Sequence, residues 1–366
     1  MKLIISGGGT GGHIFPALSI AAKVKQKDPS ADILFVGAEG RMEMEKVPAA
    51  GYPIIGLNVA GLQRHSILKN LALPFKLAQS FFKARRILNQ FRPDAVVGVG
   101  GYASGPVLWC ASRKGIPCLI QEQNSFAGLT NKMLGKKVDC ICVAYEGMER
   151  FFPQDKLVFT GNPIREGIAP ADDATRNEGI RFYGLNPQRR HILVLGGSLG
   201  SRTLNESLMG WIEQGCKGGE DVDILWQCGK YYLTEVEGFM RQHKNPCIHH
   251  TDFISRMDLA YAAADIVISR SGASSISELC VCRKATIFVP SPNVAEDHQT
   301  FNAKSLVNKG AAMMVKDADA REQLMPKAIK LVHDRQVMKA MEKNMEPLGI
   351  TDAADRIVEQ IYKIAK

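Results

Sequence analysis

The sequence predicts an α/β fold in which two Rossmann-like domains face each other across a cleft. Two observations predict it: short apolar segments alternate with longer amphipathic ones in two successive runs, and glycine-rich turns follow strands in both runs. The length agrees, because 366 residues are more than one hydrophobic core usually holds. With 45% hydrophobic and 23% charged residues, the composition is that of a globular protein.

The first run contains five apolar segments that we expect to be strands buried on both faces of a sheet. Helical segments begin between them, near Phe15, Leu68 and Gly105. Strands that alternate with helices in this way are typical of a parallel sheet covered by helices. The expected strands are KLIIS (2–6), DILFVG (32–37), AVVGVG (95–100), CLIQE (118–122) and CICVA (140–144).

The second run repeats the pattern after a polar, turn-rich connector at 170–179. We place the domain boundary near Pro163, so that residues 1–163 form the first domain and 164–345 the second. Residues 346–366 hold a last helix, which we expect to return to the first domain. The expected strands of this run are HILVLGG (191–197), DILWQCG (223–229), CIHHTDF (247–253), DIVISRSG (265–272) and ATIFVP (285–290).

Composition also limits where the chain works and what it binds. No segment approaches the ~18 apolar residues of a membrane-spanning helix, and the first apolar run is too short for a signal peptide, so we expect a cytoplasmic location. The nine cysteines include C-x-C pairs at 140/142 and 280/282 inside apolar runs, which indicates buried, reduced thiols. A net charge of +9 indicates an anionic partner.

Three glycine-rich turns follow expected strands and precede expected helices, at 7–12, 98–105 and 196–200. The first reads Gly7-x-Gly9-x-x-Gly12, a spacing that matches a dinucleotide fingerprint. Such a turn exposes backbone amides at a helix N-terminus, where an anion of phosphate size can bind. A turn that only packs a helix on a strand is the alternative for any one of them. Because both halves contain such turns, we expect a cleft lined with phosphate sites.

Two other functions remain open at this point. An NAD(P)-dependent oxidoreductase needs one such loop and an acidic residue about 20 residues further on. Glu39 is the nearest candidate and comes somewhat late, and the glycine turns of the second half would have no use. A membrane or nucleic-acid adaptor would use the block between Glu45 and Asp94, which contains eight basic residues and no acidic one. The absence of a Walker motif argues against a P-loop nucleotidase.

Seven motifs follow one another along the chain, namely GGGTGGHIFPA (7–17), VGVGGYASGP (97–106), QEQNSFAG (121–128), TGNPIRE (160–166), LGGSLGSRTLN (195–205), RSGASSISEL (270–279) and EDHQTFNA (296–303). Together they resemble the MurG family, the N-acetylglucosaminyltransferases of peptidoglycan lipid intermediate synthesis. The resemblance covers nearly the whole chain and implies a GT-B type glycosyltransferase without cofactor or nucleic-acid partner. It implies inverting transfer of GlcNAc from UDP-GlcNAc to the C4 hydroxyl of MurNAc in undecaprenyl-pyrophosphoryl-MurNAc-pentapeptide. Another GT-B glycolipid glycosyltransferase, or a UDP-GlcNAc epimerase of similar architecture, remains open on physical grounds.

The resemblance places the donor mainly on the second domain. Residues 271–274 follow a strand and open a helix, so their amides can hold a diphosphate. Glu278 can accept hydrogen bonds from both ribose hydroxyls, although Ser275-x-x-Glu278 also fits a helix-capping box. Gln299 and Asn302 are three residues apart on an expected helix, so both can face the sugar. The implied donor-binding residues are Thr10, Gly11, Gly12, Asn124, Arg165, Ser198, Ile254, Ala273, Ser274, Ser275, Ile276, Ser277, Glu278, Gln299 and Asn302.

Inverting transfer needs a base that takes the proton of the acceptor hydroxyl. His13 is the only histidine inside a glycine motif, and an unperturbed imidazole has a pKa of about 6.5, which suits this role at neutral pH. A histidine that binds the acceptor phosphate, or packs at the helix start, is the alternative role, and Glu122 is the alternative base. The resemblance implies that the acceptor diphosphate contacts Gly9, Gly100, Gly101 and Tyr102.

Two D-x-D pairs could suggest a divalent metal ion. Asp221-x-Asp223 lies at the start of a strand, the wrong end for the cleft, and Asp317-x-Asp319 lies in a polar loop. We expect solvated carboxylates at both pairs and no metal site.

The acid-free block contains the segment that we expect to attach the protein to a membrane. Pro74 fits the first turn of a helix that runs to about Phe91. Its apolar arc fits either an ordinary surface helix or an amphipathic membrane contact. Because the implied acceptor carries a polyprenyl tail, we expect peripheral attachment to anionic lipids on the cytoplasmic face of the bacterial inner membrane, around residues 64–92. The arc contains Leu77, Ala78, Phe81, Phe82, Ala84 and Leu88, with Lys76, Lys83 and Arg86 opposite.

Overall fold

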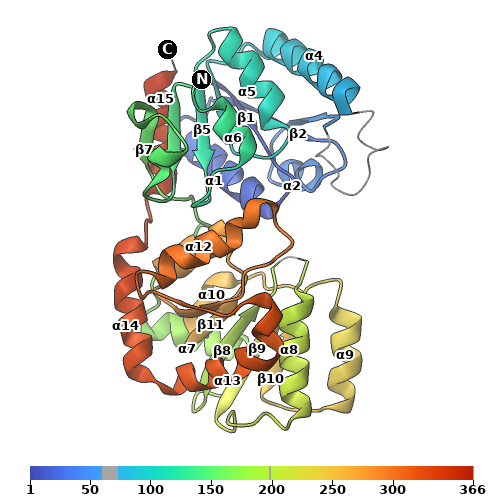
Figure 1. The fold of residues 1–366 in the computed structure, drawn as a ribbon, viewed down its shortest axis with the longest axis vertical. Coiled ribbons are helices and arrows are strands. Elements are labelled where there is room, and N and C mark those ends of the chain that lie inside the picture. Colours follow the sequence, from blue (N-terminus) through green and yellow to red (C-terminus); the bar gives the residue numbers. More distant parts are fainter. Residues whose placement is uncertain (60–72, 198, 366) are drawn as a thin grey trace. The chain divides into compact units, whose positions relative to one another are not determined.

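A computed structural model describes residues 1–59, 73–197 and 199–365 (Figure 1). The chain forms two compact units, Met1–Arg165 together with Asp352–Lys366, and Glu166–Thr351. Each unit has its own parallel sheet wrapped by helices. Within the described ranges, no helix has the length and the apolar character of a membrane span.

The first unit contains a seven-stranded parallel sheet in the order β3-β2-β1-β4-β5-β6-β7. Successive residues of a strand point to opposite faces, so a central strand must be apolar on both. In β1, Leu3 and Ile5 pack on one face and Ile4 on the other, and all three are fully buried. The strands are β1 (Lys2–Ser6), β2 (Asp32–Ala38), β3 (Ile54–Leu57), β4 (Ala95–Gly98), β5 (Cys118–Glu122), β6 (Cys140–Val143) and β7 (Leu157–Phe159).

Helices cover both faces of this sheet. Residues of α1, α2 and α15 share a core with Leu3 and Ile5, whereas α4, α5 and α6 contribute to the core around Ile4. This arrangement buries the five central strands except for the first residues of β1 and β2, and leaves the loops at the strand ends as the places where a ligand can bind. The helices are α1 (Gly11–Lys27), α2 (Glu43–Ala49), α4 (Leu73–Phe91), α5 (Ser104–Arg113), α6 (Leu129–Leu134) and α15 (Ala353–Ile364).

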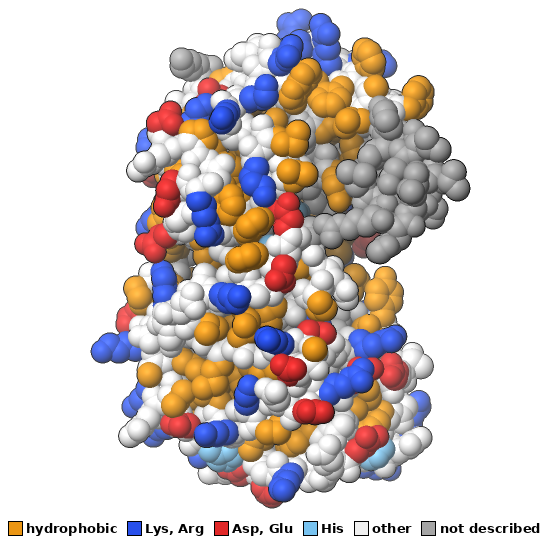
Figure 2. Space-filling view, viewed as in Figure 1, with side chains coloured by type: hydrophobic (Ala, Val, Ile, Leu, Met, Phe, Trp, Pro, Cys, Tyr) orange, Lys and Arg blue, Asp and Glu red, His pale blue; other side chains and the backbone are white. Residues whose placement is uncertain are grey.

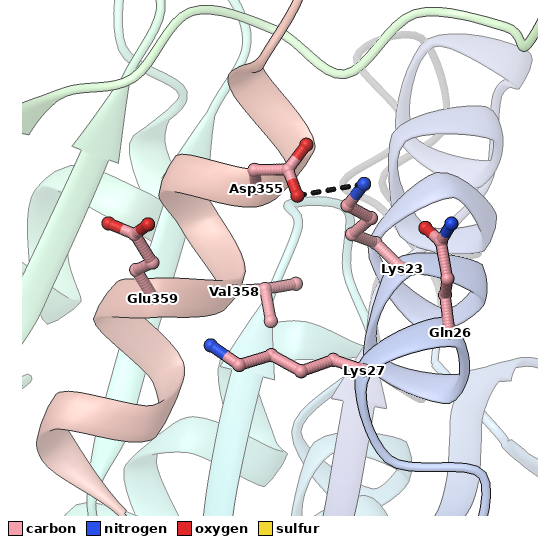
Figure 3. Close-up of a pocket in the computed structure, with 6 residues that line it drawn as sticks. All are labelled: Lys23, Gln26, Lys27, Asp355, Val358 and Glu359. Atoms are coloured by element: carbon pink, nitrogen blue, oxygen red, sulfur yellow. Dashed lines mark ion pairs between the residues drawn. The ribbon is translucent and has the colours of Figure 1, made fainter.

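The last helix, α15, joins the first unit although it follows the second unit in sequence. Ile357 is fully buried in the same core as β1. Asp355 pairs with Lys23 of α1 at 2.7 Å, and a shallow pocket between the two helices is lined by these and other charged side chains (Figure 3). Because the lining carries charges of both signs and Lys23 is already paired, we do not assign an anion to this pocket.

The second unit contains a six-stranded parallel sheet in the order β10-β9-β8-β11-β12-β13. Its main core packs on one face of β8, β9 and β11, where alternate residues of each strand point, and Trp226 of β9 is fully buried there. The strands are β8 (Arg190–Leu195), β9 (Val222–Gln227), β10 (Ile248–Thr251), β11 (Ile266–Ser269), β12 (Ala285–Phe288) and β13 (Met313–Met314). The helices are α7 (Asp173–Phe182), α8 (Arg202–Glu213), α9 (Leu233–Gln242), α10 (Met257–Ala263), α11 (Ala273–Cys282), α12 (His298–Val307), α13 (Ala320–His333) and α14 (Arg335–Met345).

Each sheet reverses its strand order at one point, between β1 and β4 in the first unit and between β8 and β11 in the second. In open parallel sheets, ligands bind beyond the carboxyl ends of the strands at such a reversal, because neighbouring loops there turn to opposite faces. The loops that follow β1, β4 and β8 are the three glycine-rich turns of the sequence, and the loop after β11 leads into the segment 271–274. The expected class, two Rossmann-like α/β domains, is confirmed.

The ten strands expected from the sequence are all present, but several end earlier than the apolar runs that predict them. β4 ends at Gly98 and β11 at Ser269, because the chain leaves the sheet there to form a loop. Three further strands, β3, β7 and β13, were not expected. Each has four residues or fewer, lies at an edge of its sheet and is only partly buried, so it lacks a long apolar run.

Helix α4 buries only part of the apolar arc expected for it. Ala84 and Leu88 lie in the core of the first unit, and the ring of Phe81 packs edge-on against Trp109 of α5, with 4.9 Å between ring centres. The contact with α5 uses a narrow stripe, which is less than the arc that a helical wheel groups together. Leu77, Ala78 and Phe82 of the same arc are exposed, so an ordinary surface helix packed through the whole arc does not describe α4.

The nine cysteines, all of them within the described ranges, form no disulfide, and seven are buried. Burial raises the pKa of the Cys118 and Cys280 thiols to about 12. These two side chains therefore remain protonated, apolar core residues at neutral pH.

Candidate active site

The two glycine loops of the first unit interlock at the strand reversal. The amide of Gly8, after β1, donates to the carbonyl of Gly100, after β4, at 3.3 Å. Gly101 has a φ of +84°, and a Cβ there would lie 2.4 Å from the Gly8 carbonyl oxygen. Only glycine fits this contact, so the glycines of both loops allow the two backbones to approach each other closely. The exposed Tyr102 follows directly.

The amides of the first glycine loop differ in what they can still bind. Gly7 donates to Val36 and Gly8 to Gly100, while Gly9 donates to the carboxylate of Glu43 at 2.8 Å. Gly11 and Gly12 open α1, where the first amides have no acceptor within the helix. We therefore expect an anion at Gly11 and Gly12. The Gly9 amide donates to a carboxylate, and a contact of Gly9 with the acceptor diphosphate stays a prediction.

His13 stands on the first turn of α1 and connects both loops. Its Nδ1 lies 3.1 Å from the Gly8 carbonyl oxygen and 3.3 Å from Thr10 Oγ1. A carbonyl oxygen can only accept, so we assign the ring proton to Nδ1 and, in the neutral ring, the lone pair to Nε2. A Cβ on Gly100 would lie 2.8 Å from this Nε2, which places the ring edge over the second loop. This tautomer is the one that can take a proton at Nε2.

Glu122, the alternative base, is 2% exposed at the end of β5. Its carboxylate accepts from the amides of Asn124 and Gly128, both at 3.0 Å, and from Asn131 Nδ2 at 2.8 Å. These bonds tie the loop after β5 and the start of α6 to the sheet. A carboxylate used in this way is a poor candidate for taking a substrate proton, so the geometry favours His13. Asn124 and Arg165, expected to contact the donor, are half-buried and exposed respectively.

In the second unit, α11 begins directly after β11 and presents its N-terminus at the strand reversal. Gly272 is its N-cap, and no side chain caps the helix there. The first amides, from Ala273 onward, can therefore bind an anion. Ser274, Ser275 and Ser277 are half-buried, whereas the side chains of Ala273 and Ile276 are buried in the helix packing.

The alternative capping role for Glu278 is wrong. Because α11 begins at Ala273, Ser275 and Glu278 lie inside the helix and cannot form its capping box. Glu278 is 2% exposed, and its Oε2 accepts a hydrogen bond from the hydroxyl of Tyr261 in α10 at 3.1 Å. The tyrosine fixes the orientation of this carboxylate, and its contact with a ribose stays a prediction.

Gln299 and Asn302 both bond to backbone groups, and the expectation that both face the sugar stays a prediction. Asn302 is fully buried and its Nδ2 donates to the carbonyl of Ser271 at 3.4 Å, so it supports the loop before α11. Gln299 is half-buried, and its Oε1 accepts from the amide of Ser291 at 2.9 Å. Ile254 is buried after β10. Ser198 lies outside the described residues.

Sequence reasoning missed an ion pair that braces the same loop. Arg270 Nη1 donates to Asp317 at 2.5 Å and to the carbonyl of Val289 at 2.9 Å, and Thr203 Oγ1 donates to the other oxygen of Asp317 at 3.0 Å. The expectation of a solvated Asp317 is wrong, and Asp223 is likewise buried and pairs with Arg189 at 2.7 Å. Among the residues the structure describes, no cluster of three or more His, Cys, Asp or Glu could hold a metal ion.

Comparison with known proteins links both units to one family. The N-terminal domain of glycosyltransferase family 28 matches residues 3–143, and the C-terminal domain of that family matches residues 191–357. The chain is 54% identical to a Parabacteroides distasonis protein named UDP-N-acetylglucosamine--N-acetylmuramyl-(pentapeptide) pyrophosphoryl-undecaprenol N-acetylglucosamine transferase, over 99% of this chain and 98% of that protein. A protein of the same name from Bacteroides fragilis is 53% identical over 100% of this chain and 96% of its own length.

Solved structures agree. The crystal structure of Acinetobacter baumannii MurG superposes with a TM-score of 0.79 at 30% identity, covering 99% of both chains. The calicheamicin glycosyltransferase CalG4 superposes with a TM-score of 0.70 at 13% identity, over 100% of this chain and 99% of that one, which shows a shared fold alone.

Proposed function

This chain belongs to glycosyltransferase family 28, and from that premise we propose the reaction that its glycine loops serve. The chain is a hexosyltransferase that moves N-acetylglucosamine from UDP-N-acetylglucosamine to the C4 hydroxyl of MurNAc in undecaprenyl-pyrophosphoryl-MurNAc-pentapeptide, a step of peptidoglycan synthesis. The observation that carries this proposal is the 54% identity to a transferase of that name along nearly the whole of both chains. The oxidoreductase alternative has no support, since Glu39, its expected ribose ligand, pairs with Lys83 at 2.9 Å.

We assign donor recognition mainly to the second unit. The N-terminal amides of α11 hold the diphosphate, and Glu278 accepts from the ribose hydroxyls with its carboxylate oriented by Tyr261. Arg270 and Asn302 act through the backbone, because they fix the loop that carries these amides. The diphosphate gains charge as the sugar leaves, so fixed amides at this position stabilise the transition state as well as the bound donor.

We assign proton transfer to His13. With Nδ1 donating to the Gly8 carbonyl, Nε2 can take the proton of the acceptor C4 hydroxyl as this oxygen attacks the anomeric carbon. The opposite face of that carbon releases UDP, which gives inversion. The amides of Gly11 and Gly12, beside His13 on the same turn, are the groups of this unit that we assign to the donor, as the resemblance implies.

The reaction is tested by transfer of labelled GlcNAc from UDP-GlcNAc to a short-chain lipid-linked MurNAc-pentapeptide. We expect a labelled disaccharide product that depends on the acceptor. Conversion of UDP-GlcNAc to its 2-epimer without acceptor would instead identify an epimerase, and the absence of any product would contradict the proposal.

We further propose that α4 attaches the protein to anionic lipids at the cytoplasmic face of the inner membrane. Phe75 and Phe82 are 76% and 75% exposed, and they lie seven residues apart, on one side of the helix. Hydrophobic side chains gather over α4 beside Lys and Arg side chains (Figure 2). Exposed aromatic rings next to cations fit a lipid surface, where each basic residue contributes about 1 kcal/mol. The exposed Leu129 and Met133 of α6 extend the apolar surface of this unit.

A further inference from the structure

Glu43 is a buried charge that the proposed mechanism has not used. It is the first residue of α2 and is 1% exposed, although α2 belongs to none of the glycine motifs. Its Oε1 accepts from the amide of Ala38 at 2.9 Å, and its Oε2 accepts from the amide of Gly9 at 2.8 Å. Burying a carboxylate is costly unless both oxygens are satisfied, so this contact is a built feature of the loop.

The amide that Glu43 binds belongs to the same peptide group as the carbonyl that binds His13. Gly9 N–H and Gly8 C=O form one planar trans peptide, since the described residues contain no cis bond. The N–H side of this group faces Glu43, and the C=O side faces His13 Nδ1 at 3.1 Å. One rigid plane therefore connects the carboxylate to the imidazole.

This peptide needs a group that holds it, because both of its residues are glycines. Gly8 and Gly9 have φ values of +144° and +89°, and glycine adopts many other combinations at little cost. A flipped peptide would point its N–H at His13 Nδ1 and would favour the opposite tautomer, with the proton on Nε2. In that state His13 could not accept a proton at Nε2.

We propose that Glu43 is a positioning residue that sets the tautomer and orientation of His13 through the Gly8–Gly9 peptide. The arrangement corresponds to the carboxylate that orients a catalytic histidine elsewhere, with a peptide group inserted between the two. Polarisation along this chain of hydrogen bonds strengthens each of them. The proposal rests on the assignment of His13 as the base. The contact is tight, since a Cβ on Gly8 would lie 2.3 Å from the Glu43 carboxylate and would displace it.

The first test is Glu43→Gln, which keeps the shape but replaces one acceptor by a donor, so that only one of the two backbone amides can be bound. We expect kcat to fall by about 10²-fold, as for a misplaced catalytic group, while the KM for UDP-GlcNAc stays within about twofold. The matched control is Glu45→Gln on the same helix, whose side chain is 80% exposed and pairs only with its neighbour Lys46 in the described structure. This control should leave kcat unchanged.

A double-mutant cycle separates positioning from a general loss of structure. In a His13→Ala background, Glu43→Gln should cause no further loss of kcat. An equal loss in both backgrounds would overturn the proposal. If His13→Ala alone leaves kcat unchanged, the assignment of the base fails, whereas a normal kcat for Glu43→Gln beside an impaired His13→Ala overturns only the role of Glu43.

A spectroscopic readout does not depend on turnover. The ¹⁵N chemical shifts of His13 should report a protonated Nδ1 in the parent and a larger share of the Nε2–H tautomer in Glu43→Gln. If Glu43→Gln does not fold, Glu43→Asp serves instead, since its shorter side chain cannot span both amides. An unchanged His13 tautomer in the folded variant would overturn the proposal.

Discussion

At the scale of single residues, His13 owes its chemistry to a backbone carbonyl. Gly8 C=O accepts from Nδ1, so the proton transfer that we propose at Nε2 depends on the conformation of a glycine loop. We expect His13→Ala to lower kcat by roughly 10²–10⁴-fold, the usual contribution of a general base. Steady-state kinetics with a soluble acceptor analogue measure this. A rise confined to the acceptor KM would identify His13 as a binding group and would make Glu122 the better candidate for the base.

In the second unit, the candidate residue Glu278 is oriented by the hydroxyl of Tyr261, as His13 is by the Gly8 carbonyl in the first. Glu278→Ala removes charge-assisted bonds to the ribose and should weaken UDP binding by roughly 2–4 kcal/mol in titration calorimetry. Tyr261→Phe is the matched variant, because it deletes only the hydroxyl that orients the carboxylate and should cost about 1 kcal/mol. Unchanged UDP affinity in a destabilised Glu278→Ala would show that the carboxylate serves the fold alone.

At the scale of elements, α4 buries one stripe in the core and exposes the surface that we propose as the membrane contact. The test of this surface neutralises basic residues of α4. It omits Lys83, whose charge is already paired with Glu39, and Lys69, which lies outside the described residues. We expect joint neutralisation of Lys76, Arg85 and Arg86 to reduce sedimentation with anionic vesicles and to lower its salt sensitivity, with turnover of a soluble acceptor unchanged.

The control for α4 is neutralisation of three exposed lysines of the second unit, Lys327, Lys330 and Lys343. It changes the net charge by the same amount at a different surface. Equal loss of vesicle binding in both variants would mean that α4 is not the anchor and that net charge alone drives binding. Substitution of Phe75 and Phe82 by serine tests the apolar part, and should weaken binding at high salt as well.

At the scale of the whole molecule, each unit has its own sheet and its own core, so a ligand of one unit need not order the other. UDP should slow amide hydrogen exchange most strongly at 271–278 and in the neighbouring loops of the second unit, because a ligand stabilises the segments that it contacts. Hydrogen-exchange mass spectrometry with and without UDP measures this. Protection confined to 7–13 would contradict the assignment of the donor to the second unit.

Much of the architecture could be read from local pattern. Local features of the sequence predicted ten of the strands, the two runs of strand and helix, and the glycine turns. A strand buried on both faces needs a short apolar run, and a tight turn needs glycine, so each can be recognised within a few residues. The sequence did not predict the short edge strands β3, β7 and β13, because they are only partly buried and therefore have no long apolar run. The sequence pattern of α4 showed an apolar arc but could not show which part of it α5 would cover.

The sequence by itself determined the fold class, the places of the glycine loops and the candidate residues His13 and Glu278. Only the tertiary structure decided how these residues are held, because their partners are far away in the chain: Glu43 is 34 residues from Gly9, and Asp317 is 47 from Arg270. It also excluded a capping box at Ser275 and Glu278, because α11 starts before Ser275, and it showed Glu122 enclosed in hydrogen bonds. A periodic pattern records which face of an element is buried, whereas the meeting of two side chains depends on strand order and packing over the whole unit.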